Sequence, residues 1–75
     1  MVDLCKMDID RVGIIKKIEV PDDIKRRFLD IGIIPENKII RVLEDYSQNI
    51  SAYLIMNSII AIRNIDTEGI EVIYE

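Results

Sequence analysis

The first ten residues group side chains that suggest metal chemistry. Asp3, Asp8 and Asp10 lie near Cys5 in the sequence, and carboxylate and thiolate groups both bind divalent transition metals. Such sites usually recruit imidazole as well, and the sequence contains no histidine. Acidic residues near a chain terminus are ordinarily solvated. We therefore predict a solvated terminus here and no metal ligands.

The rest of the sequence carries no pattern typical of catalysis. Without histidine there is no Ser-His or Cys-His pair, and Gly13, Gly32 and Gly69 are too isolated to form a phosphate-binding loop. The spacing of the acids does not match a calcium loop. We predict no catalytic residue and no cofactor, so the protein is not expected to be an enzyme.

The charge balance disfavours nucleic acids as partners. The formal net charge is −4, whereas affinity for phosphate backbones comes from an excess of Lys and Arg. Within the basic run 25–27, Arg26 and Arg27 lie four residues after Asp22 and Asp23, so each arginine is expected to pair with its aspartate along one helix. We predict no nucleic-acid binding.

Two observations favour a cytoplasmic protein. No apolar run approaches the roughly 18 residues that cross a bilayer, and the acidic start is unlike a signal peptide. Cys5 is the single cysteine, so it forms no internal disulfide, and we expect a small, partly buried hydrophobic side chain in a reducing setting. Neither membrane insertion nor export is predicted.

Sequence periodicity predicts a short helix early in a single domain over residues 1–75. Residues 12–20 are rich in β-branched side chains, which is typical of a strand. Pro21 ends that strand, and Asp22 or Asp23 is then expected to cap a helix over 22–31. The apolar face of this helix is expected to comprise Ile24, Phe28 and Ile31, widened by Leu29.

The stretch after the helix is predicted to be a sharp turn. Gly32 stands where helices commonly end in a left-handed residue, so we expect it to have a positive φ. Pro35 then prevents helical continuation, and the β-branched residues 38–43 predict a strand.

The carboxyl-terminal half is predicted to consist of three more strands. Residues 50–63 are two extended segments around Asn57 and Ser58, which favours a hairpin with these residues as its tight turn. Residues 70–74 form the last strand. About five strands and one short helix indicate a mainly β protein, and closure into a small barrel would remove exposed sheet edges.

The order of these features resembles the FeoA family of ferrous iron transport proteins, whose domain is an SH3-like barrel. The residues that carry the resemblance are Arg27, Phe28, Leu29, Asp30, Ile31, Gly32, Ile33 and Pro35, then Asn57, Ala61, Ile62 and Arg63, and finally Ile70 and Val72. The chain departs from the family pattern where Glu36 and Asn57 replace glycines, where Thr67 replaces alanine, and in the loop over 45–51, which lacks an Asp-Pro pair.

The resemblance implies a small cytosolic protein that docks on the cytosolic part of the ferrous iron transporter FeoB and modulates Fe(II) uptake. Self-association is compatible with this role. The alternative is a regulatory module, because a similar barrel forms the C-terminal domain of iron-dependent repressors of the diphtheria-toxin type.

Partner contacts are expected beside the helix stop. Ile33, Ile34 and Pro35 lie on a short loop where two isoleucines cannot both easily face a core, so Ile33 is expected to be exposed and Ile33→Asp to leave the fold intact. Arg27 and Arg63 are the expected polar contacts. Arg63 is alternatively expected to tie down the loop after its strand through Asp66 or Glu68.

Overall fold

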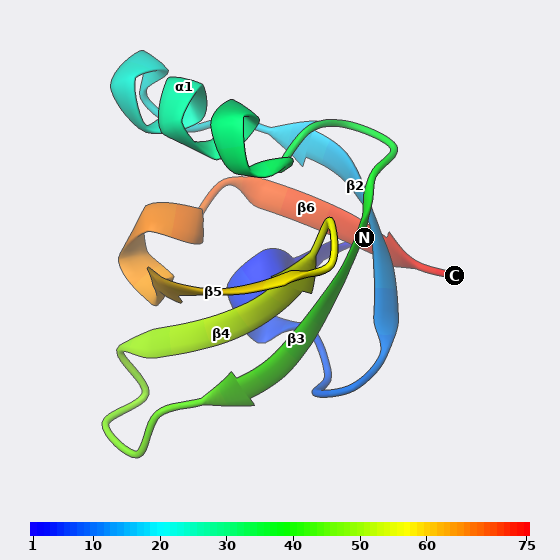
Figure 1. The fold of residues 1–75 in the computed structure, drawn as a ribbon, viewed down its shortest axis with the longest axis vertical. Coiled ribbons are helices and arrows are strands. Elements are labelled where there is room, and N and C mark those ends of the chain that lie inside the picture. Colours follow the sequence, from blue (N-terminus) through cyan, green and yellow to red (C-terminus); the bar gives the residue numbers. More distant parts are fainter.

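A computed structural model describes residues 1–75 as one curved antiparallel sheet with a single α-helix (Figure 1). In chain order the elements are β1 (Val2–Asp3), the 3-10 helix η1 (Leu4–Lys6), β2 (Val12–Ile18), α1 (Asp22–Ile31), β3 (Lys38–Glu44), β4 (Ile50–Ile55), β5 (Ser58–Arg63), the 3-10 helix η2 (Asn64–Thr67) and β6 (Ile70–Tyr74). The mainly β class and the helix over 22–31 are confirmed. The two-residue strand β1 makes six strands in place of about five.

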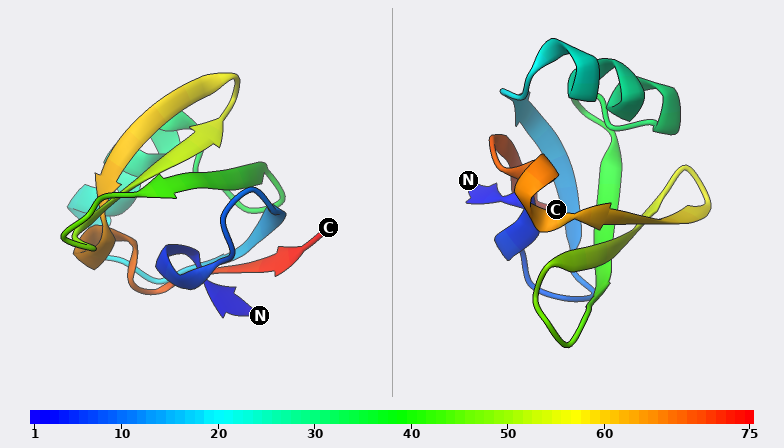
Figure 2. Two further views of the ribbon diagram at one scale, coloured as in Figure 1. Left: turned by 90° about the horizontal axis from the view of Figure 1, so that it is seen from below. Right: turned by 90° about the vertical axis from the view of Figure 1, so that its left-hand side faces the viewer.

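The sheet bends round on itself without closing. The strand order is β1-β6-β2-β3-β4-β5, and the view from below shows the curved wall that these strands form (Figure 2). The register shifts between Ile15 and Lys17 and between Arg41 and Leu43, where bulges increase the local bend. The expected removal of both sheet edges is wrong, because β6 is already paired on its two sides with β1 and β2, which leaves β5 without a further strand.

The core fills the inside of this curved sheet. It takes its apolar side chains from every strand except the two-residue β1, and from both sides of the helix stop, and its buried members are Leu4, Met7, Ile15, Phe28, Ile33, Ile39, Tyr53, Ile55, Ile62, Ile70 and Val72. Tyr53 is fully buried and its hydroxyl donates to Leu4 O over 3.4 Å. Burial raises the pKa of the Tyr53 phenol, so this side chain stays neutral.

The amino-terminal segment contributes two apolar side chains to the core, whereas Asp8 and Asp10 are exposed to solvent as predicted. Leu4 and Met7 are fully buried, and the backbone N–H of Asp8 donates to the Tyr74 hydroxyl over 2.8 Å. The guanidinium of Arg11 lies 3.5 Å from the centre of the same ring. Two apolar residues in a single 3-10 turn are too short a pattern for periodicity to reveal.

Helix α1 begins one residue earlier than an aspartate cap requires. Pro21 precedes its first turn and no side chain caps it, so Asp22 and Asp23 lie inside that turn, where their charge suits the helix dipole. No ion pair joins Asp22 to Arg26 or Asp23 to Arg27, because exposed pairs gain little for the side-chain entropy they lose. No helix of the protein is long and apolar enough to cross a membrane.

The tight turn of the β4–β5 hairpin lies one residue earlier than predicted. Ile55 pairs with Ser58, so the two turn residues are Met56 and Asn57, with φ angles of 49° and 65°. Two successive positive φ angles are typical of a type I′ turn, whose twist matches that of the flanking strands. Asn57 is therefore a turn residue as predicted, whereas Ser58 begins β5.

Candidate docking site

A groove runs between helix α1 and strand β5. One end of it is lined by Arg27, Phe28 and Ile31 from the helix and by Ile60, Ala61, Ile62, Arg63 and Asp66 from β5 and η2, and this end encloses about 300 Å³. The other end is lined by Leu29, Asp30, Ile31, Gly32, Ile34, Asn37, Ile55, Met56, Ser58 and Ile60. Ile31 and Ile60 line both ends, so the groove is continuous. Most of its lining residues are apolar and a few are charged, and this combination is common in protein contacts.

The structure divides the predicted contact residues between the surface and the core. Arg27, Arg63 and Ile34 line the groove, and Pro35 is exposed on the loop beyond it. Ile33, by contrast, has no exposed surface. Its predicted exposure is wrong, because the helix stop turns this side chain inward, where it belongs to the core cluster. Leu29, which was expected to face the core, is 47% exposed and lines the groove instead.

The helix stop sets the shape of the groove at its Leu29 end. Gly32 has φ 98° and ψ 9°, which confirms the predicted left-handed conformation. Its N–H donates to Leu29 O over 3.2 Å, and the N–H of Ile33 donates to Phe28 O over 2.9 Å, as in a Schellman-type end. The Asn37 amide then donates to Gly32 O over 2.8 Å. The loop leaving the helix is therefore held by two backbone hydrogen bonds and by one from the Asn37 side chain.

Arg63 takes the structural role that was expected for it. Its Nε donates to Asp66 Oδ2 over 2.9 Å, and its Nη2 lies 2.9 Å from the same oxygen. The Arg63 side chain is largely exposed while that of Asp66 is mostly covered. The pair fixes η2 at the end of β5 and leaves Arg27 as the cation of the groove without an ion-pair partner.

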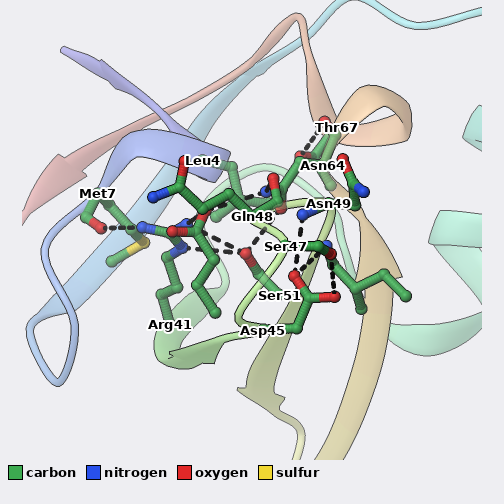
Figure 3. Close-up of polar contacts among 12 residues, drawn as sticks. Leu4, Met7, Arg41, Asp45, Ser47, Gln48, Asn49, Ser51, Asn64 and Thr67 are labelled. Carbon is green, nitrogen blue, oxygen red and sulfur yellow. Dashed lines mark hydrogen bonds and ion pairs between the residues drawn. The ribbon is translucent and has the colours of Figure 1, made fainter.

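A largely buried polar network surrounds Arg41 of β3 and joins it to β4 and to the amino-terminal segment (Figure 3). This network was not predicted from the sequence. Arg41 is only 7% exposed. Its Nη1 donates to Met7 O over 3.0 Å, its Nε donates to Ser51 Oγ over 3.2 Å, and its Nη2 donates to Glu44 Oε2 over 2.5 Å. One side chain thus connects η1, β3 and β4. The signal was present, because Arg41 lies two residues from Ile39 and so on the inward face of β3.

Asn64 completes this network from the start of η2. It accepts a hydrogen bond from Ser51 Oγ over 2.6 Å, and its amide donates to Glu44 Oε2 over 3.0 Å and to Gln48 O over 2.9 Å. No buried side-chain nitrogen or oxygen of the protein lacks a partner. A fully satisfied network of this kind specifies one arrangement of the strands that it joins.

The loop over 45–50 is ordered by one carboxylate (Figure 3). Asp45 Oδ1 accepts the backbone N–H groups of Asn49 and Ile50 over 2.9 and 3.1 Å, and Oδ2 accepts the Ser47 hydroxyl over 2.7 Å. These hydrogen bonds, that from Ser47 first, lower the pKa of Asp45 below its usual value. The loop keeps a defined shape without the Asp-Pro pair that the FeoA pattern has.

No group of three or more His, Cys, Asp or Glu side chains lies close enough together to hold a metal ion. Cys5 is half-buried, and Asp8 pairs with Arg11 over 3.3 Å. Among the hollows of the surface, the groove beside β5 has the exposed apolar side chains Leu29 and Met56 in its lining.

Comparison with known proteins places the fold. No protein-family model matches the chain, and no curated protein matches it. Solved structures do match. Iron(II) transport protein A from Clostridium thermocellum superposes with a TM-score of 0.91 at 22% identity, over 97% of this chain and 45% of that one. The FeoA protein from Chlorobium tepidum gives a TM-score of 0.90 at 15% identity, over 97% of this chain and 70% of that one.

The chain has the FeoA fold. A crystal structure of an iron uptake regulatory protein (FeoA) matches over 99% of this chain and 96% of its own length, with a TM-score of 0.84 at 18% identity. The resemblance inferred from the order of the motifs is therefore confirmed for the fold. This chain spans less than half of the Clostridium thermocellum protein and nearly all of the crystallised one.

Two of the departures from the FeoA pattern preserve the backbone conformation that glycine favours. Glu36 has φ 76° and Asn57 has φ 65°, both in the left-handed region where a side chain is strained. The Glu36 carboxylate accepts two hydrogen bonds from Lys16 Nζ, over 2.9 and 3.0 Å. The two turns therefore retain the backbone conformation of a glycine turn, at the cost of some backbone strain at Glu36 and Asn57.

Proposed function

We propose that the protein is a non-enzymatic accessory protein of ferrous iron transport. In this role it docks, in the cytoplasm, on the cytosolic part of a FeoB-type transporter and modulates Fe(II) uptake. The observation that carries the proposal is the superposition on three FeoA structures along 97–99% of this chain. The solved structures share the fold at 15–22% identity, so the docking partner is our inference.

The surface fits a docking role better than a catalytic one. The groove between α1 and β5 has mostly apolar lining, with Arg27 and Asp30 of the helix among its few charged residues. Leu29 and Met56, both exposed, stand along its margin. Exposed apolar side chains gathered on one groove mark a protein contact more often than a solvent surface. The net charge of −4 keeps nucleic acid unfavourable as a partner.

Calorimetric titration with the soluble cytosolic part of the transporter tests the proposal. We expect saturable binding by the parent protein and binding about tenfold weaker by Leu29→Asp, because a charge in an apolar contact loses its solvation. Leu43→Asp is the matched control, since Leu43 is 54% exposed on β3 and does not line the groove. Absence of binding by the parent would refute the proposed function. If Leu29→Asp and Leu43→Asp lower the affinity equally, the contact does not lie specifically in the groove.

A further inference from the structure

The outer edge of β5 carries a row of free backbone groups. The N–H of Asn64 donates to Asn49 O, on the β4 side, over 2.7 Å, and Ile62 pairs with Ser51 in the same ladder. Backbone N–H and C=O directions alternate along a strand. The backbone groups of Ile62, and of the residues two and four positions before it, therefore point to β4. The N–H and C=O groups of Ile59 and Ala61, and the N–H of Arg63, point away from the sheet.

No other part of the chain covers this edge. None of the backbone hydrogen bonds made by loops and turns, and no side-chain hydrogen bond, reaches the backbone of Ile59 or Ala61, and β5 is the last strand in the sheet order. Arg63 precedes η2, whose first turn uses the Arg63 carbonyl. Its six residues pair with β4 without a register shift. The opposite edge strand, β1, has only two residues.

Natural proteins usually protect such an edge, and this one is unprotected. Lysines, prolines and bulges are the common devices, and β5 has none of them in Ser58–Arg63. Ile59, the second residue of the strand, is 68% exposed. An uninterrupted edge with an exposed β-branched side chain is suited to pairing with another strand.

The groove lies directly beside this edge and has the length and charge of a strand site. Six residues of β5 span roughly 20 Å at about 3.3 Å per residue. Ile31 and Ile60 form the apolar floor along that length. Of the charged groups, Arg63 and Asp66 pair with each other, so Arg27 is the unpaired cation of the groove. Asp30 lies three residues further along the same helix.

We propose that an extended segment of the partner protein adds to β5 as a further strand of the sheet. Its backbone would pair with Ile59, with Ala61 and with the N–H of Arg63. Its alternate side chains on the groove side would be apolar and would pack on Ile31 and Ile60, and an acidic side chain would lie at the Arg27 end. This inference rests on the proposed function, because it specifies how the transporter's cytosolic part is held.

The backbone part of the proposal is tested by Ala61→Pro against Ala61→Val. Proline removes the outward N–H of an exposed residue without touching the ladder to β4, and valine keeps that N–H with a similar side chain. With the soluble cytosolic part of the transporter as the probe, we expect affinity at least about tenfold lower for Ala61→Pro, since an acceptor on the added strand loses its donor. Ala61→Val, which keeps the donor, should lose much less affinity than Ala61→Pro, and equal losses by the two variants would contradict the backbone pairing.

Hydrogen exchange gives a measurement that needs no substitution. On adding the same cytosolic part, the amides of Ile59, Ala61 and Arg63 should gain protection in alternation with residues already bonded to β4. This readout decides the question if Ala61→Pro fails to fold. Exchange that is unchanged at these three amides in the bound complex would overturn the proposal.

Arg27→Glu tests the position of the acidic side chain, with Arg26→Glu as its matched control. Both arginines are exposed on α1, but only Arg27 lines the groove. We expect about tenfold weaker binding for Arg27→Glu and near-parental binding for Arg26→Glu. If both variants lose the same affinity, the loss is due to the overall charge of α1. The predicted acidic side chain beside Arg27 would then be wrong.

The outcomes separate this inference from the proposed function. If the parent fails to bind the cytosolic part, the proposed function fails. If the parent binds and Ala61→Pro binds equally well, docking stands and the strand pairing is wrong. If the parent elutes as a dimer and Ala61→Pro as a monomer, the edge is occupied by a second copy of the chain, which also overturns the proposal.

Discussion

Gly32 and Met56 lie in direct contact where the helix stop meets the tip of the β4–β5 hairpin. A Cβ built on Gly32 would lie 2.5 Å from Met56 Cγ. The Asn37 amide, which donates to Gly32 O, also lies 3.7 Å from Met56 Sδ. The end of α1 and the turn that starts β5 are thus held together, and this contact fixes the spacing between the two walls of the groove.

Gly32→Ala is expected to destabilise the protein by more than about 1 kcal/mol, because an L side chain is strained at a φ of 98° and the new Cβ meets Met56. Urea unfolding of Gly32→Ala, Met56→Ala and the double variant separates the two causes. The double variant should recover the part due to the clash and keep the part due to φ. An unchanged midpoint for Gly32→Ala would mean that the helix ends in another conformation.

The elements predicted most accurately are those that end at a proline or a glycine, because these residues restrict or permit particular backbone conformations. Pro21 and Gly32 bracket α1, and both of its bounds are as predicted. Strand β6 is likewise found over the predicted residues. The hairpin turn is displaced because Met56 adopts a positive φ, which propensity assigns to Asn, Asp and Gly. The burial of Leu4 and Met7 depends on contacts distant in the sequence, and no local pattern encodes them.

The candidate site was only partly predictable for the same reason. Arg27 and Arg63 line the groove as the contact hypothesis requires, and Arg63 pairs with Asp66. The path of the chain after Gly32, by contrast, depends on the tertiary packing of the loop. That packing places Ile33 in the core and Ile34 in the groove, and the sequence offers two adjacent isoleucines with no local difference between them.

Arg41→Met is expected to cost about 3 kcal/mol or more, because Met7 O would lose its partner and the Glu44 carboxylate would lose its cation in a largely buried setting. Asn64 would remain as the partner of Glu44 and Ser51. A domain of this size has about 4–11 kcal/mol in total, so the variant should be close to unfolded at room temperature. Arg63→Met is the control, since its ion pair lies at the surface and is worth about 0–1 kcal/mol. Thermal unfolding followed by circular dichroism measures both. Similar melting temperatures for the two variants would contradict a structural role for the buried network.

Asp45 is expected to make the loop over 45–50 sensitive to acid. Hydrogen bonds to its ionised form lower its folded-state pKa, so its stabilising contribution is present above the unfolded pKa of about 3.9 and is lost as the pH falls through the folded value. Asp45→Asn should therefore be less stable than the parent near pH 6, and the difference should shrink below about pH 4. Urea unfolding at several pH values measures the gap. Asp30→Asn, which removes an exposed carboxylate that accepts no hydrogen bond, controls for the change in net charge. A gap that is constant with pH would mean that the carboxylate's charge does not order the loop.

Ile33→Asp is expected to unfold the protein, in contrast to the exposed position that the sequence suggested. The side chain is fully buried within the core cluster, and a carboxylate there has no partner and no solvent. The cost of burying it is comparable with the whole stability of a domain this small, about 4–11 kcal/mol. Ile65→Asp is the matched control, because Ile65 is 68% exposed in η2 and an acid at such a site should change stability by no more than about 0.5 kcal/mol.

Ile34→Asp should fold, since this side chain is only partly buried at the margin of the groove, and it should weaken docking. Circular dichroism of the three variants, followed by titration of those that fold, distinguishes the two isoleucines. A folded Ile33→Asp that no longer binds would return Ile33 to the contact surface and show that the loop after Gly32 can turn outward.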